Sequence, residues 1–221
     1  VYETPNATVL STNVLFGVQS VSPKGGGLTG MYYDTALAAN YMAGIRETET
    51  RENFSVLILG MGSGTYASLC REFFGDIAVE GVEIDEKIAS LAKQYFGLPE
   101  DIPITIYDGR AFLGVSDRNY DVILVDAYQD ITIPFQMSSQ EFFTLVKERL
   151  KDDGILAVNL NMRGNEEGGI SQAVSDTIAS VFPVVYTADV PYSTNRVVFA
   201  SENQEMLLRY ENNLSAEEDE L

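Results

Sequence analysis

Short apolar runs alternate with helical patterns along most of this chain. Residues 55–60 hold a continuous apolar run that ends in glycine, which is typical of a strand buried on both faces of a sheet. Further strands are predicted at 77–83, 104–107, 120–126 and 155–160, helices at 65–74, 85–96, 110–113, 138–150 and 169–181, and a closing antiparallel pair at 183–187 and 196–201. This alternation predicts a mostly parallel seven-stranded sheet with helices on both faces.

The chain divides into three parts on this pattern. Residues 1–50 are expected to form an N-terminal β segment, with a strand or hairpin at 9–20, and a lead-in helix at 33–48. Residues 51–210 form the α/β domain, and residues 211–221 are an acidic tail whose end is expected to be disordered.

Composition removes several classes of function. The chain has 221 residues, no histidine, one cysteine and a formal net charge of −19. Histidine triads, histidine general bases, histidine metal sites and an internal disulfide are therefore excluded. The acidic balance disfavours nucleic acid and suits cationic or neutral small substrates, or it serves solubility alone.

Localisation is read from the apolar runs. None approaches the roughly 20 residues that cross a bilayer, and no signal peptide is visible. A cytoplasmic protein without membrane contact by this segment is expected. Because the chain begins with valine, it can also be the soluble part of a longer protein.

The loop after the first strand of the α/β domain is rich in glycine. Its members Gly60, Gly62, Ser63 and Gly64 precede a predicted helix, whose free N–H groups can meet a ligand. Such a turn alone equally indicates tight packing. Glu83, at the end of the next strand, sharpens the prediction, because a carboxylate there can accept both hydroxyl protons of a ribose.

Two further strand ends carry aspartates. Asp108 and Gly109 follow the third strand, where a carboxylate can accept from an adenine amine, although an Asp-Gly turn is the simpler alternative. Asp126 ends the fourth strand and suits a general base or an anchor for an ammonium group. Because all these positions lie at one sheet edge, together they predict an adenosine-containing ligand.

These motifs resemble one known family. The matching segments are 16–20 (FGVQS), 30–34 (GMYYD), 56–64 (VLILGMGSG), 82–85 (VEID), 107–112 (YDGRAF) and 120–126 (YDVILVD). They are similar to the spermidine synthase (aminopropyltransferase) family, over about residues 16–201. The resemblance implies a Rossmann-like, S-adenosylmethionine-dependent methyltransferase-type fold behind a small N-terminal β-domain. It also implies a homodimer that transfers an aminopropyl group from decarboxylated S-adenosylmethionine to a small amine, without a metal.

The resemblance also implies roles for single residues. Glu83 would hold the ribose, and Asp108 and Gly109 would meet the adenine. Asp126 matches the family's catalytic aspartate, and Tyr33 stands where the family has a residue that contacts the nucleoside.

Three residues are implied on the substrate side. Tyr32 matches a tyrosine that lines the substrate, and Gln19 matches a glutamine near the reacting centre. Tyr128, with Tyr32 and Tyr33, can flank a polyamine by cation–π contact, whereas a buried helix start is the alternative for these tyrosines.

The chain departs from the family where the cofactor tail and the amine are recognised. Ser63 replaces an aspartate that binds the ammonium of the decarboxylated cofactor and repels the carboxylate of ordinary S-adenosylmethionine. The second carboxylate of the catalytic loop, Asp130, comes one position late, and residues 131–134 replace a Gly-Pro. Two alternatives therefore stay open: a methyltransferase that uses S-adenosylmethionine on a small acceptor, and a non-catalytic nucleoside-binding domain.

Overall fold

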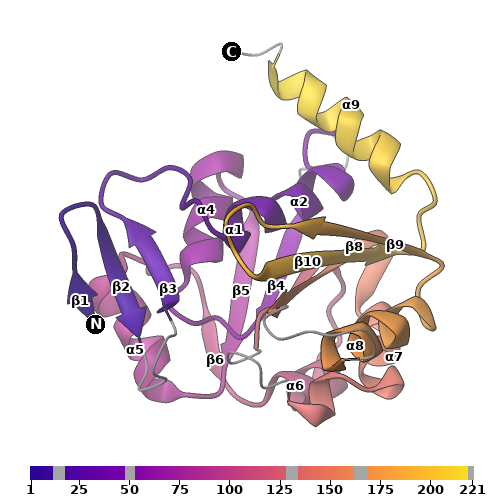
Figure 1. Cartoon of the computed structure of the whole chain (residues 1–221), viewed down its shortest axis with the longest axis horizontal. Coiled ribbons are helices and arrows are strands. Elements are labelled where there is room, and N and C mark those ends of the chain that lie inside the picture. The colour runs from indigo at the N-terminus through magenta and orange to yellow at the C-terminus, as the bar shows by residue number, and fades with distance from the viewer. Residues whose placement is uncertain (12–17, 48–52, 128–133, 162–168, 219–221) are drawn as a thin grey trace.

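The computed structural model describes residues 1–11, 18–47, 53–127, 134–161 and 169–218. A seven-stranded sheet with the order β6-β5-β4-β7-β8-β10-β9 forms its centre (Figure 1). Its strands are β4 (Ser55–Leu59), β5 (Ala78–Glu83), β6 (Ile104–Ile106), β7 (Tyr120–Val125), β8 (Leu150–Asn161), β9 (Val184–Asp189) and β10 (Asn195–Ser201). The pairs from β6 to β8 are parallel and β10 is antiparallel to both neighbours, so the predicted fold class is confirmed.

Helices cover both faces of this sheet. They are α1 (Tyr32–Ala36), α2 (Ala38–Met42), α4 (Thr65–Phe74), α5 (Glu86–Tyr95), α6 (Gly109–Val115), α7 (Gln140–Glu148), α8 (Ile170–Ala179) and α9 (Met206–Glu218), with a 3₁₀ turn at Phe135–Met137. Val56 and Ile58 of β4 face the core under α1, α2 and α4, whereas Leu57 and Leu59 face the core under α6, α7 and α8. A strand buried on both faces explains its continuous apolar run.

A separate small sheet lies before the main one. It consists of β1 (Tyr2–Glu3), β2 (Ala7–Ser11) and β3 (Val18–Pro23), paired antiparallel in this order. Figure 1 shows this sheet beside the end of the main sheet that carries α4 and α5. The predicted N-terminal β segment is present, and the exact division of the chain at residues 50 and 210 stays a prediction.

The predicted helix at 33–48 is wrong in its continuity, because two short helices replace it. The carbonyl of Leu37 accepts from both the backbone N–H and the side-chain amide of Asn40, at 3.0 and 3.2 Å. Leu37 is the C-cap of α1 and the N-cap of α2, so these local bonds lie at the break between the two helices. After α2 the chain turns at Gly44, which has φ of +82° and terminates the helical segment.

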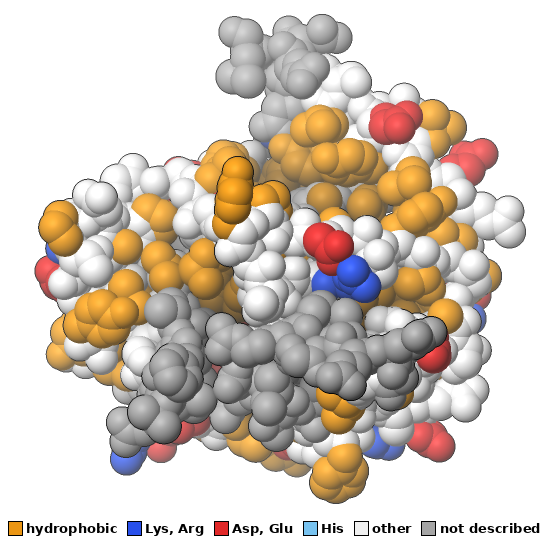
Figure 2. All heavy atoms as spheres, viewed as in Figure 1, with side chains coloured by type: hydrophobic (Ala, Val, Ile, Leu, Met, Phe, Trp, Pro, Cys, Tyr) orange, Lys and Arg blue, Asp and Glu red, His pale blue; other side chains and the backbone are white. Residues whose placement is uncertain are grey.

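The expected disorder near the end of the acidic tail is wrong up to Glu218, because α9 continues to that residue. Met206 is fully buried, and Tyr210 packs edge-on against Tyr41 of α2 at 6.3 Å between ring centroids. Hydrophobic side chains also gather around α9 at the surface in Figure 2. Acidic residues near a helix C-terminus are locally unfavourable, so tertiary contacts hold this helix and its own sequence gives little signal for it.

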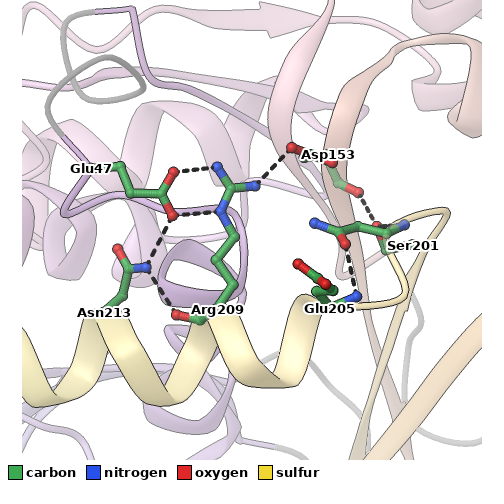
Figure 3. Close-up of polar contacts among 8 residues, drawn as sticks. Glu47, Asp153, Ser201, Glu205, Arg209 and Asn213 are labelled. Atoms are coloured by element: carbon green, nitrogen blue, oxygen red, sulfur yellow. Dashed lines mark hydrogen bonds and ion pairs between the residues drawn. The ribbon is translucent and has the colours of Figure 1, made fainter.

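Arg209 is the centre of the polar contacts of α9 (Figure 3). Its Nε and Nη2 donate to the two carboxylate oxygens of Glu47 at 2.7 and 2.6 Å, and its Nη1 lies 3.2 Å from Asp153. The side chain of Asn213 links the same carboxylate to the backbone of Arg46. One guanidinium thus joins α9 to the turn after α2 and to β8.

We expect Arg209→Met to lower the free energy of unfolding by about 1–2 kcal/mol, because a bidentate pair whose guanidinium is mostly covered is lost while the apolar stem stays. Chemical denaturation measures this change. Arg196→Met is the matched control, since Arg196 makes a similar bidentate pair with the exposed Asp189. An equal loss in both variants would contradict a special role of Arg209 in docking α9.

Candidate active site

The glycine-rich turn after β4 has the conformation that only glycine adopts readily. Gly60, Gly62 and Gly64 have φ of +91°, +56° and +78°. The N–H groups of Gly60 and Met61 both donate to the carbonyl of Val82 on β5, at 2.9 and 3.0 Å. The turn is therefore anchored to the neighbouring strand and begins α4 at Thr65.

Glu83 lies at the end of β5, beside this turn. Its side chain is buried, with Oε2 accepting from the N–H of Gly62 at 2.9 Å and Oε1 accepting from the N–H of Asp85 at 3.0 Å. Each carboxylate oxygen keeps further lone-pair capacity. The carboxylate is thus fixed in place by the backbone and can accept two more hydrogen bonds side by side, as a pair of ribose hydroxyls would require.

Asp108 and Gly109 lie at the start of α6. Asp108 Oδ1 accepts from the N–H of Ala111 at 2.8 Å, so this carboxylate is the N-cap of α6. One of its two oxygens therefore has a local structural role. Gly109 packs against Leu59 and Met137. Asp85 is likewise the N-cap of α5.

Exposed apolar side chains flank these carboxylates. Ile84 follows Glu83 and is 68% exposed, and Tyr107 precedes Asp108 and is 50% exposed. Large exposed apolar side chains can mark a binding site, and these two lie next to the carboxylates that are predicted to bind a nucleoside. The sequence reasoning did not name them, although their positions next to the two acids were the available signal.

Asp126 follows β7 and receives a hydrogen bond on each carboxylate oxygen. The hydroxyl of Tyr32 donates to Oδ2 at 2.6 Å, and the side-chain amide of Asn159 donates to Oδ1 at 2.9 Å. Its own backbone N–H donates to Leu59 of β4 at 2.8 Å. Burial raises the pKa of Asp126 to about 7, with a smaller increase from the charge of Glu83, while the bonds from Tyr32 and Asn159 oppose this increase.

Asn159 was missed by the sequence reasoning. It is a buried polar residue in the otherwise apolar end of β8, and this interruption of the pattern was the signal that could have found it.

The two tyrosines of α1 are buried and packed on each other. Their ring centroids lie 4.1 Å apart at 37°, and the hydroxyl of Tyr33 is 3.4 Å from Ser20 Oγ of β3. Burial raises the pKa of both phenols above the usual value, so Tyr32 stays protonated and donates to Asp126. The buried helix start foreseen as the alternative is therefore present, and Tyr32 also reaches the catalytic candidate.

Ser63 lies in a buried cluster of hydroxyl groups. Its Oγ is 2.9 Å from Thr65 Oγ1, and its N–H donates to Ser20 Oγ at 3.4 Å. Thr65 in turn donates to the carbonyl of Val21 on β3. The glycine turn thus meets the N-terminal sheet through neutral groups.

Three residues named in the sequence analysis are not placed by this geometry. Tyr128 lies outside the described residues, as does Asp130. Gln19 belongs to β3, but its side chain is not part of the described structure.

The fold and this row of strand ends define a class of protein, the Rossmann-like proteins of the methyltransferase type. Among solved structures, human methyltransferase-like protein 13 in complex with SAH is similar with a TM-score of 0.72 and 24% identity, covering 84% of this chain and 90% of that one. A probable spermidine synthase from Corynebacterium glutamicum gives a TM-score of 0.68 and 18% identity, covering 91% and 79%.

Sequence comparison then gives the family. Residues 37–212 match the family described as the spermine/spermidine synthase domain, and the chain belongs to it. A protein of Bifidobacterium longum named "Probable polyamine aminopropyl transferase" is 58% identical over 195 residues, which cover 87% of this chain and 42% of that protein. The chain spans about half or less of the length of the curated relatives it matches first.

The described residues hold neither a membrane-spanning helix nor a cluster of metal ligands. Within these residues, no helix combines the length and apolar character of a membrane span. The same part of the chain holds no group of three or more acidic or cysteine side chains arranged for a metal ion.

Proposed function

We propose that this protein transfers an aminopropyl group from decarboxylated S-adenosylmethionine to a di- or polyamine, with Asp126 as the base. The observation that carries the proposal is the carboxylate of Asp126, which two donors hold, which lies beside the glycine-rich turn, and whose pKa is raised to about 7. The printed name of the Bifidobacterium longum relative supports the same activity.

The nucleoside of the co-substrate would lie along the ends of β4, β5 and β6. Glu83 would accept from the ribose hydroxyls, since two backbone donors fix it and leave acceptor capacity. Asp108 and Gly109 would meet the adenine, and the exposed side chains of Ile84 and Tyr107 would cover its faces.

The reaction needs an unprotonated amine. With a lysine-like pKa of about 10.4, freeing the amine costs about 4–5 kcal/mol at pH 7. Asp126 would take this proton as the nitrogen attacks the methylene carbon beside the sulfonium. The new N–C bond forms as the C–S bond breaks, and the sulfur keeps the electron pair and leaves as neutral methylthioadenosine.

Fewer described contacts support the part of the site that would bind the acceptor amine. Tyr32 would meet the amine at its hydroxyl end, because one face of its ring packs on Tyr33. Substrate contacts by Gln19 and Tyr128 and a nucleoside contact by Tyr33 stay predictions, as do the homodimer, the cytoplasmic location, the lack of nucleic-acid partners and a metal-free reaction.

The proposal is tested with purified protein, decarboxylated S-adenosylmethionine and putrescine or spermidine. We expect methylthioadenosine and a longer polyamine in equal amounts, measured by mass spectrometry. Formation of S-adenosylhomocysteine from ordinary S-adenosylmethionine would support the methyltransferase alternative instead. Tight nucleoside binding without any product would support the non-catalytic one.

We expect Glu83→Gln to weaken methylthioadenosine binding by about 10- to 100-fold, because an amide NH₂ would oppose one of the two backbone donors and lose a ribose acceptor. Isothermal titration calorimetry measures the affinity. Glu80→Gln, on the same strand but bonded to Tyr120, should bind normally. Unchanged affinity in Glu83→Gln would show that Glu83 does not bind the ribose hydroxyls.

Because position 63 is a serine, we expect the protein to discriminate little between decarboxylated and ordinary S-adenosylmethionine. Since the hydrogen-bond partners of Ser63 among the described residues are neutral hydroxyls, we expect wild type to bind the decarboxylated and ordinary forms within about tenfold of each other. Ser63→Asp should then favour the decarboxylated form by about 10- to 100-fold through a charge-assisted bond and a repulsion. Competition titrations measure the ratio, with Ser63→Asn as the neutral control. An equal shift in Ser63→Asn would rule out charge as the cause.

A further inference from the structure

A chain of three hydrogen bonds connects a distant hairpin to the carboxylate of Asp126. Ser193 Oγ donates to Asn195 Oδ1 at 2.7 Å, Asn195 Nδ2 donates to Asn159 Oδ1 at 2.9 Å, and Asn159 Nδ2 donates to Asp126 Oδ1 at 2.9 Å. Every donor in this chain points toward the carboxylate. Hydrogen bonds aligned in this way polarise one another and favour negative charge at their end.

The direction of this row of hydrogen bonds is determined by its two ends, Ser193 and Asp126. If the buried amide of Asn159 were turned over, its oxygen would face the carboxylate and its NH₂ would face the NH₂ of Asn195. Ser193 Oγ accepts from the backbone N–H of Asn195 at 3.1 Å, so its own proton is directed at the side-chain oxygen of the same residue. Only one orientation of both amides therefore satisfies all groups.

The hairpin between β9 and β10 is built to present these residues. The N–H of Val190 donates to the carbonyl of Asn195 at 3.0 Å, and the N–H of Ser193 donates to the carbonyl of Val190 at 3.2 Å. Tyr192 has φ of +58°, and it is the one non-glycine residue with a positive φ in the described part of the chain. The closed turn keeps this conformation despite its cost, which is a frequent property of functional segments.

We propose that Asn159 and Asn195 are positioning residues, which hold the Asp126 carboxylate in one orientation for the proton transfer. Asn159 acts directly on the carboxylate, and Asn195 acts through Asn159. The inference rests on the proposed function, because that function gives Asp126 its role as base.

The consequence is a change in the titration of Asp126. The described titratable groups that influence it are Tyr32 and Tyr33 of α1 and Glu83 of β5. Burial and Glu83 raise the pKa of Asp126, while Tyr32 and Asn159 lower it. Since Tyr32 and Glu83 stay in place when the asparagines are replaced, loss of the amide donors should raise this pKa further.

The test is a carboxyl ¹³C NMR titration of the protein labelled at aspartate, with the Asp126 signal assigned by its loss in Asp126→Asn. Asn159→Leu should raise the pKa of Asp126 by about 1 pH unit, as expected for one lost hydrogen bond to a charged group. Asn195→Leu should raise it by about half as much. Asn195 is partly exposed on the hairpin, so this second variant keeps the test valid if Asn159→Leu does not fold.

Thr194→Val is the matched control, because Thr194 lies on the same hairpin but donates to Asn161 at 2.9 Å. It should leave the titration of Asp126 unchanged. An Asp126 signal that does not move in Asn195→Leu, or that moves equally in Thr194→Val, would overturn the inference.

Activity gives a second readout. The acid limb of the pH–rate profile should move to higher pH by the same amounts, whereas a purely structural role would lower the rate equally at every pH. If wild type makes no product while the NMR shifts occur as expected, the proposed function fails and the hydrogen-bond chain stands.

Discussion

Asp126→Asn should lose about 10²- to 10⁴-fold in the rate of aminopropyl transfer while methylthioadenosine binds as in wild type. An asparagine can still bond to Tyr32 and Asn159, so the geometry is kept, but it cannot take the proton of the amine. In wild type the rate should rise with pH through about 7, as Asp126 becomes deprotonated. Single-turnover kinetics across pH measure both effects.

The same variant should be more stable than wild type at alkaline pH. Burial raises the pKa of Asp126 above that of the unfolded chain, so between pH 4 and 7 the folded state holds a proton that the unfolded state has released. The free energy of unfolding of wild type therefore falls as pH rises through this window. The full difference corresponds to about 4 kcal/mol, and water around the half-buried carboxyl reduces it to about 2 kcal/mol.

Asp121→Asn is the control for both measurements. Asp121 lies on the same strand β7, but at the opposite end, where it accepts from Ser55 and pairs with Lys151. Its replacement should lower stability and leave the transfer rate of the folded protein unchanged. Full turnover by Asp126→Asn, or no gain in its stability at pH 8 relative to pH 4, would show that Asp126 is not a buried base.

The closeness of Glu83 and Asp126 could be predicted from the sequence, because the order of the strands determines it. Both residues end strands of a parallel sheet, and β4 lies between β5 and β7, so their side chains share one edge. The glycine turn could be predicted for the same reason, since a backbone that must bend sharply between strand and helix needs residues without a Cβ.

Other features depend on contacts between segments far apart in the sequence. Asn159 and Asn195 become neighbours only because β10 returns antiparallel to β8, and no local pattern states the register of this pair. Similarly, α9 depends on Arg209 meeting Glu47, 162 positions earlier in the chain. Local propensity cannot report such pairs, which is why the hydrogen-bond chain and the last helix escaped the sequence reasoning.

Gly60→Ala should lower the free energy of unfolding by about 3–5 kcal/mol and weaken nucleoside binding by the protein that still folds. A Cβ at this position would lie 2.6 Å from the carbonyl oxygen of Asp126 and 2.8 Å from the nitrogen of Ala127. These are backbone atoms, and the turn cannot move away from them because Val82 holds it from the other side. The expected loss combines the cost of a left-handed conformation with this collision.

Gly97→Ala separates the two causes. Gly97 also has a positive φ, +65°, but an added Cβ there would have no atom within 4 Å. We therefore expect a loss of only about 1–2 kcal/mol, from conformation alone. Chemical denaturation of both variants, with calorimetric titration of methylthioadenosine, gives the comparison. Equal destabilisation would mean that the backbone of Asp126 yields to the methyl group, and the close contact between the glycine turn and Asp126 would then have no role in shaping the site.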